Sequence, residues 1–139
     1  MPSASYAIKA EVSDPSAGSW TFGDQKTMYG GKRIGVGDTV FVFASENEGG
    51  TGLIACGIVI SAEATPRRIG IERQTPRVSI TVNRTNQPKC RLGRSELTSF
   101  SDWNDGRPET ELNFKFYRQA TNKIVGLSES TAAYLGSLF

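Results

Sequence analysis

The chain has 139 residues, of which 37% are hydrophobic and 22% are charged, and its formal net charge is +2. This length fits one domain over residues 1–139, and no apolar run reaches the roughly 20 residues that span a bilayer. With no histidine and only two cysteines, the composition excludes Ser-His and Cys-His nucleophile pairs, a disulfide scaffold and a zinc site.

The first half of the sequence predicts three strands and one ordered loop. Residues 5–12 have enough alternation for an opening strand. Residues 20–33 show neither the strand period nor the helix period, so we expect an ordered loop with one helical turn. The β-branched and aromatic run at 39–45 and the apolar run at 53–64 predict the two strands of a hairpin.

The second half predicts further strands and two helices. Residues 67–74 are expected to form a short strand. Residues 77–85 alternate cleanly between apolar and polar side chains, which is typical of a strand with one buried face. Residues 94–100 fit a short helix whose N-cap is Ser95.

The C-terminal part ends in a helix. Residues 112–119 alternate and predict a strand or an extended segment, and residues 123–127 form a last short apolar run. Ser128 is the expected N-cap of a helix over residues 129–139. Five to seven strands with one or two short helices make a compact α+β or barrel fold.

Charge is distributed unevenly along the chain. The segment 65–94 holds eight basic residues and one acidic residue, a net charge of +7, while the remainder carries −5. Arginine predominates here, and its planar guanidinium matches phosphate geometry. The segment is either a solvated face or a surface for a polyanion. The basic residues are Arg67, Arg68, Arg73, Arg77, Arg84, Lys89, Arg91 and Arg94.

Three blocks taken together resemble the EVE domain of the PUA-like superfamily, to which ASCH domains also belong. The first, IGVGDTVFVFASENEGGTGLIACGIV, is similar to the family's Gly-acid turn, aromatic strand ending in Ser and glycine-bearing return strand. The second is PRVSITVNRTNQPKCRLGRSEL, a strand, proline link and short helix. The third, FYRQATNKIVGLSESTAAYL, is similar to the family's Arg-Gln, apolar core and C-terminal helix. The blocks cover about residues 20–139.

The resemblance implies an α+β fold, a PUA-like mixed β pseudo-barrel of about five to seven strands with short helices and a C-terminal helix. It also implies a module that binds nucleic acid, RNA or DNA, and reads one modified base in a pocket beside a basic surface. Two features depart from the family pattern. The stretch SWTFGDQKTMYGG lacks the family's Arg-Asn pair, and Ala44 occupies the position where the family often has histidine.

The resemblance and the residue types together indicate six candidates for the base pocket. An aromatic ring can stack on a base that has left the duplex, and a hydroxyl, carboxylate or amide can bind the base edge. Each candidate also has a plainer interpretation, as a packed aromatic ring or as part of an ordinary turn. The six are Trp20, Tyr29, Ser45, Glu46, Asn47 and Trp103. Arg118 and Gln119 match the family's Arg-Gln pair, for which a bracing role in the barrel is expected.

Two other functions remain open at this point. A small ASCH-like hydrolase of modified nucleosides would use a lysine, a threonine and a glutamate, for which Lys32, Thr39 and Glu63 are candidates. A regulatory domain would bring the basic segment against an acidic protein. We expect a binding domain without cofactor or metal, in the cytoplasm and not in a membrane, that works alone or beside a separate effector protein.

Overall fold

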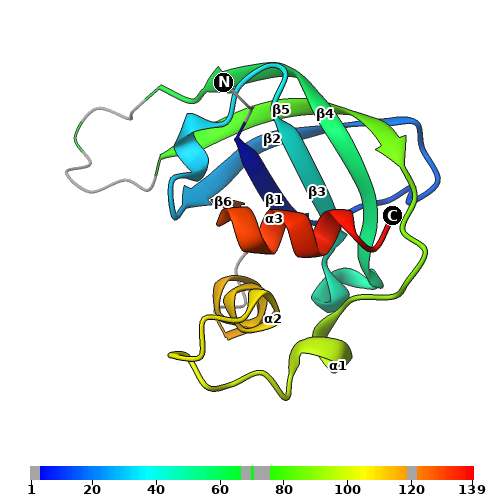
Figure 1. The fold of residues 1–139 in the computed structure, drawn as a ribbon. Helices are drawn as coiled ribbons and strands as arrows, with labels where there is room; N and C mark the ends of the chain where they lie inside the picture. The colour runs from blue at the N-terminus through cyan, green and yellow to red at the C-terminus, as the bar shows by residue number, and fades with distance from the viewer. Residues whose placement is uncertain (1–3, 67–69, 71–75, 119–121) are drawn as a thin grey trace.

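The computed structural model describes residues 4–66, 70, 76–118 and 122–139. Six strands in this part of the chain close into a barrel with the order β1-β3-β4-β5-β2-β6 (Figure 1). They are β1 (Ser5–Ala10), β2 (Ser19–Met28), β3 (Thr39–Ala44), β4 (Gly52–Ala64), β5 (Arg77–Asn86) and β6 (Lys123–Gly126).

The barrel is mixed. Strand β1 runs parallel to β3, and β2 runs parallel to β6, while the other neighbouring strands are antiparallel. The short strand β6 completes the ring because it pairs with β1 on one side and β2 on the other. Ile124 is the register partner of both Ile8 and Thr27. Closure leaves no strand of the ring with an open edge.

Alternate residues of the strands fill the barrel. Ile8, Val42, Val82 and Ile124 are fully buried and Ile80 is 1% exposed, and all five belong to one apolar cluster. Every second residue of β1 and β3 therefore points into the barrel, as the pleat of a strand requires.

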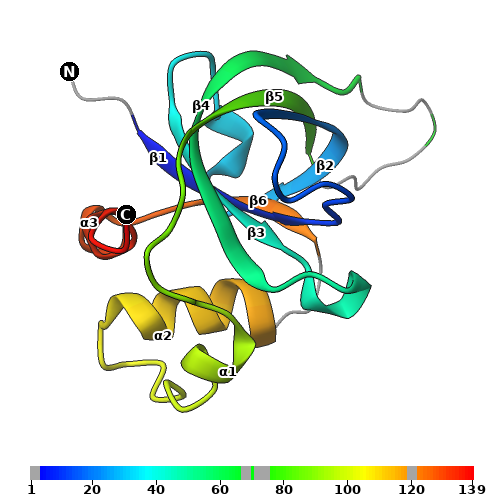
Figure 2. The same cartoon turned by 90° about the vertical axis from the view of Figure 1, so that its right-hand side faces the viewer.

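A second apolar cluster covers the outer face of β1 and β3. Phe43 of β3 lies with its ring centroid 5.1 Å from that of Phe116, and both side chains are fully buried. The covering elements are α1 (Arg94–Leu97), α2 (Pro108–Leu112), the π-helix η3 (Asn113–Arg118) and α3 (Glu129–Gly136). In Figure 2, α1 and α2 lie below the barrel and α3 lies along its side.

The start of α3 is fixed by hydrogen bonds. Ser128 is its N-cap, and its Oγ accepts a hydrogen bond from the backbone N–H of Thr131 at 3.3 Å. The same hydroxyl donates to the carboxylate of Glu111 at 2.6 Å, which ties α3 to α2. The predicted cap and the predicted helix are both confirmed.

Most of the predicted strands are confirmed, but the loop expected at residues 20–33 is wrong. Strand β2 covers Ser19–Met28, and the expected helical turn follows as the 3-10 helix η1 (Gly31–Arg33). A bulge between Phe22 and Gln25 interrupts the pairing with β5. Because the bulge shifts the alternation by a residue, the strand period cannot be seen in the sequence.

Two further expectations are wrong. The segment 112–119 is not extended: its described part, up to Arg118, is helical. Leu112 and Phe116 are both fully buried, and a spacing of four residues fits one face of a helix as well as one face of a strand. The first helix has Gly93, not Ser95, at its N-cap, and the Gly93 N–H donates to Glu96 at 2.7 Å.

The strand expected at 67–74 lies outside the described residues, apart from Gly70. None of the helices in the described part of the chain has the length and apolar character needed to cross a membrane.

Candidate functional site

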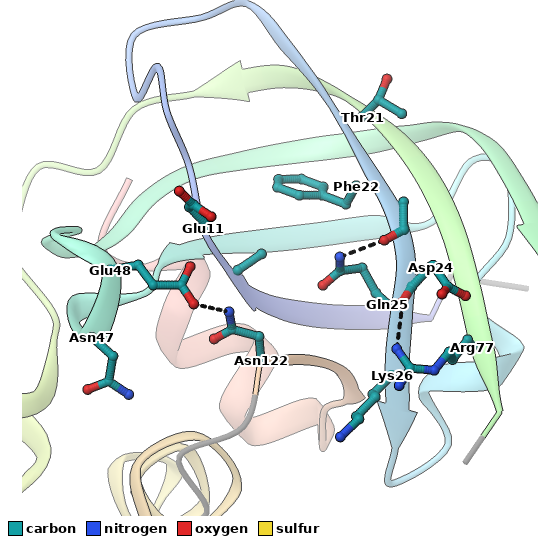
Figure 3. Close-up of a pocket in the computed structure, with 12 residues that line it drawn as sticks. Glu11, Thr21, Phe22, Asp24, Gln25, Lys26, Asn47, Glu48, Arg77 and Asn122 are labelled. Atoms are coloured by element: carbon teal, nitrogen blue, oxygen red, sulfur yellow. Dashed lines mark hydrogen bonds between the residues drawn. The ribbon is translucent and has the colours of Figure 1, made fainter. Parts of the chain in front are cut away.

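A pocket of about 550 Å³ opens at the end of the barrel where β1 stops (Figure 3). Its wall comes from the end of β1, the bulge of β2, the start of β5, the 3-10 helix η2 (Glu46–Glu48) and Asn122 just before β6. The elements that form it are far apart in the sequence and meet only because the barrel closes. The volume lies within the range of about 300–1,000 Å³ that small-ligand sites occupy.

The bulge of β2 shapes one side of the pocket. Asp24 has a positive φ of 54°, an uncommon conformation for a residue other than glycine. Three bonds hold it there: its N–H donates to Ser79 Oγ at 2.8 Å, Thr65 Oγ1 donates to its carboxylate at 2.9 Å, and Arg77 Nη1 donates to its carbonyl at 3.0 Å. The pocket wall is therefore preorganised.

The pocket combines one aromatic ring with several polar groups. Phe22 lines it from β2, although the side chain is only 5% exposed. Figure 3 shows the ring of Phe22 beside Glu11, and below them Asn122, which donates a hydrogen bond to Glu48 at 3.0 Å. Carboxylate, amide and cationic groups converge here, so the lining can both accept and donate hydrogen bonds.

Two of the residues predicted from the sequence meet in this pocket. Asn47, a candidate for binding the base, and Arg77, a candidate for binding the nucleic-acid backbone, both line it. Asn47 also accepts a hydrogen bond at Oδ1 from Arg94 Nη2 at 3.0 Å. A second member of the basic segment, Arg94, thus supports the pocket wall.

A buried polar cluster lies behind η2, on the outer face of the barrel. One Glu46 carboxylate oxygen accepts hydrogen bonds from the Arg94 backbone N–H at 2.7 Å and from Tyr117 Oη at 3.1 Å. Burial, followed by the charge of Glu46, raises the pKa of Tyr117, so this phenol stays protonated. Ser45 is 1% exposed, and its hydroxyl has no hydrogen-bond partner among the described residues. Ser45 and Glu46 are not among the residues that line the pocket with Asn47.

Two lysines are buried next to this cluster. Lys9 and Lys123 are register partners on β1 and β6 and are 1% and 0% exposed. Lys9 Nζ donates to the Phe116 carbonyl at 2.7 Å. Burial lowers the pKa of both amines. The pKa of Lys123 falls to about 8, mainly through burial and further through the positive charge of Lys9.

Trp20 does not lie in a loop and does not line the pocket. It lies in β2, is 9% exposed and belongs to the barrel core. Its indole N–H donates to the Asp14 carbonyl at 2.9 Å, and the Arg84 guanidinium lies 5.0 Å from the ring centroid. Trp20 is therefore a packed ring of the barrel core, which is the plainer of its two interpretations.

Tyr29 and Trp103 lie together elsewhere. Each is 39% exposed, and each makes an edge contact with Phe114, at centroid distances of 6.3 Å and 5.4 Å. The guanidinium of Arg118, for which a bracing role is expected, lies over the rings of Phe114 and Trp103. Gln119 lies outside the described residues.

The described basic residues of the segment 65–94 have different surroundings. Arg77 lines the pocket, Arg84 covers Trp20, and Arg94 supports Asn47. Lys89 is exposed, and Arg91 is paired with Glu96 at 3.5 Å. Arg67, Arg68 and Arg73 lie outside the described residues.

The strand pairing of the barrel does not place the candidate residues of a hydrolase next to one another. Thr39 pairs with Ile58 on β4, whereas Glu63 lies five residues further along that strand, or about 16 Å away at 3.3 Å per residue. Lys32 is exposed in η1. In the described residues, no three carboxylate, thiol or imidazole groups gather where they could hold a metal ion.

Sequence reasoning missed several residues of the site. Phe22 lies in the segment expected to be a loop. It is two residues from Trp20, and this spacing is typical of a strand and could have identified it. Lys9 and Lys123 stand out only as single charges inside apolar strands. Asn122 and Glu11 carry no local signal, because barrel closure alone brings them to the pocket.

No protein-family model matches the sequence, and no curated protein does. Solved structures match over nearly the whole chain. One is the crystal structure of human THYN1 protein in complex with 5-methylcytosine containing DNA, at 15% identity and a TM-score of 0.63, covering 98% of this chain and 97% of that one. The two chains share one fold, which agrees with the EVE-like barrel expected from the sequence.

Two other matches share this EVE-like fold. The DUF55 domain of human thymocyte nuclear protein 1 is 15% identical with a TM-score of 0.63, and 96% of each chain is covered. A hypothetical protein from Leishmania major is also 15% identical, with a TM-score of 0.61 and coverage of 98% of this chain and 94% of that one. The expected PUA-like pseudo-barrel is confirmed.

Proposed function

We propose that this protein binds DNA and holds one modified cytosine, taken out of the base stack, in the pocket at the end of the barrel. The observation that carries the proposal is the pocket of about 550 Å³ in which Phe22 shares the wall with amide, carboxylate and cationic side chains. The complex of the similarly folded human THYN1 protein with 5-methylcytosine containing DNA supports the choice of base.

The polar lining fits the edge of a cytosine. The exocyclic amine of cytosine is a hydrogen-bond donor that carboxylates accept, and the pocket offers the carboxylates of Glu11, Asp24 and Glu48. Asn47 can both donate to and accept from the remaining ring atoms. An extra methyl group on the base would gain apolar contact with Phe22.

A base must leave the stack to enter the pocket, and extrusion costs a few kcal/mol. Hydrogen bonds to the base edge and contacts to the phosphates would offset this cost, because Phe22 is 5% exposed and belongs to the barrel core, so it offers little of its ring for stacking. Lys26 and Arg77 at the pocket would neutralise phosphates on either side of the base, which binds the strand without reading its sequence. Binding should therefore weaken steeply as salt increases.

The test is fluorescence anisotropy with two labelled duplexes that differ only in one 5-methylcytosine. Wild-type protein should bind the methylated duplex about 10-fold more tightly, and Asn47→Ala should weaken binding of the methylated duplex because it removes a hydrogen bond to the base edge. Arg77→Gln should weaken both duplexes and reduce the salt slope by about one. Ile60→Ala serves as control, because Ile60 is 48% exposed on β4 and outside the pocket. Absence of salt-dependent binding to either duplex, or equal affinity for both, contradicts the proposal.

A further inference from the structure

Three aromatic rings form a row on the surface outside the pocket. Phe114 of η3 lies in the middle, with Tyr29 at a centroid distance of 6.3 Å on one side and Trp103 at 5.4 Å on the other. The two outer rings are each 39% exposed. Exposed rings of this size are normally covered in a protein that binds nothing, so a contiguous row marks an interaction surface.

Cations are interleaved with the rings. Lys115 Nζ lies 5.0 Å from the centroid of Tyr29, and the guanidinium of Arg118 lies 5.1 Å from Phe114 and 5.3 Å from Trp103. We call these five residues the aromatic strip. Rings with alternating cations are the surface on which single-stranded nucleic acids bind, because each base has a flat face and each nucleotide a charge.

The acidic residues near the aromatic strip are engaged in local structure. Asp105 accepts from Thr110 Oγ1 at 3.0 Å and from the Arg107 N–H at 2.9 Å. Glu111 accepts from Ser128 Oγ at 2.6 Å and from Lys115 at 3.1 Å. Arg118 has no carboxylate within ion-pair distance among the described residues, so its charge is available to a phosphate.

The aromatic strip is connected to the pocket by short lengths of chain. Lys26, which lines the pocket, and Tyr29 lie three residues apart at the end of β2. Arg118 ends η3, and Asn122 lines the pocket four residues later, a reach of at most about 14 Å. A strand that places a base in the pocket can therefore pass over the aromatic strip.

We propose that the aromatic strip binds the unpaired nucleotides that flank the extruded base, by stacking on Trp103 and Phe114 and by pairing phosphates with Arg118. This inference rests on the proposed function and extends it from one base to a single-stranded segment. It follows that the protein binds an unmodified single strand as well, without sequence preference, more weakly than it binds a modified site.

The test uses intrinsic fluorescence and a short oligothymidine of about twelve nucleotides. The sequence has two tryptophans, so Trp20→Phe leaves Trp103 as the only indole, and stacking should quench its emission. Because Trp20 is a core residue, a second measurement uses anisotropy of the labelled oligothymidine with Trp20 intact. There, Trp103→Ala and Arg118→Gln should each weaken binding about 10-fold, while Val36→Ala, at a site 70% exposed outside the aromatic strip, should not.

An unquenched Trp103, or unchanged oligothymidine affinity in both strip variants, overturns the inference. Quenching by an acidic peptide but not by oligothymidine also overturns it, in favour of a protein partner. Failure of the proposed function gives a different result. Wild-type protein would then bind the methylated and the unmethylated duplex with equal affinity, independently of how the variants of the aromatic strip bind oligothymidine.

Discussion

Arg94 donates a hydrogen bond from Nη2 to Oδ1 of Asn47 at 3.0 Å, joining the first residue of α1 to the wall of the pocket. The guanidinium also lies 5.5 Å from the centroid of Tyr117. A residue of the basic segment 65–94 therefore contacts a side chain that lines the pocket. In the proposed function, Arg94 positions Asn47.

Replacement of Arg94 by alanine should weaken binding of the methylated duplex about 3–10-fold, because Asn47 loses the bond that fixes its amide. Anisotropy titrations of both duplexes measure this. Arg91→Ala is the matched control, since it removes the same charge from the ion pair with Glu96 without touching Asn47. If the two variants lose methylation preference equally, Arg94 contributes only its charge.

Removal of the Ser45 hydroxyl should stabilise the fold. The hydroxyl is buried without a hydrogen-bond partner in the described structure, and such a group costs about 1–3 kcal/mol. Ser45→Ala should therefore raise the free energy of unfolding in urea by about 1 kcal/mol and leave duplex binding unchanged. A loss of methylation preference in this variant would show that Ser45 reaches the base after all.

The buried charge of Lys123 should make stability depend on pH. Its pKa is lowered to about 8 by burial and then by Lys9, so between pH 8 and about 10 the unfolded chain binds more protons than the folded one. The Lys123 contribution to the free energy of unfolding therefore increases with pH over this window. Below pH 8 both states are protonated and the cost of the buried charge is fully present.

Comparison of wild type with Lys123→Met at each pH isolates this contribution from that of the titratable groups the two proteins share. The variant should gain stability relative to wild type below pH 8, and the difference should shrink by about 1–3 kcal/mol on going to pH 10. Urea unfolding at a series of pH values measures the difference. A gap that stays constant with pH means that Lys123 has an ordinary pKa in the fold.

Gly57 should not tolerate a side chain. A Cβ at this position would lie 2.5 Å from the Asn83 carbonyl oxygen and 2.5 Å from Val82 Cγ1, where β4 and β5 approach closely. Gly57→Ala should lower the free energy of unfolding by about 1–3 kcal/mol. Gly136→Ala is the control, because nothing lies within 4 Å of its Cβ position in α3, and it should be neutral or slightly stabilising. Equal stability of the two variants would show that the strands can separate at Gly57.

The sequence predicted the elements whose residues carry a local signal. Strand β5 was found because Val78, Ile80 and Val82 alternate with polar residues, and α3 because Ser128 caps it. Strand β2 was missed because the bulge at Gly23 and Asp24 breaks the alternation, and the helical segment at Leu112 and Phe116 was missed because their spacing fits both periods.

The candidate site was predicted only in part, for a topological reason. Asn47 and Arg77 were identified from residue type and resemblance, and they do line one pocket. Their neighbours Glu11 and Asn122 come from opposite ends of the chain and meet through the pairing of β1 with β3 and β6. No local pattern encodes that proximity. Trp20 belongs to the barrel core, whereas Tyr29 and Trp103 contact Phe114.

The pairing of β6 with both β1 and β2 also governs when the protein can fold during its synthesis. Until residues 123–126 have left the ribosome, β1 and β2 each lack a neighbour, and their exposed amide and carbonyl groups can pair with another nascent chain. The four residues of β6 thus remove both open edges at once, and slowing elongation before they have left the ribosome should increase aggregation.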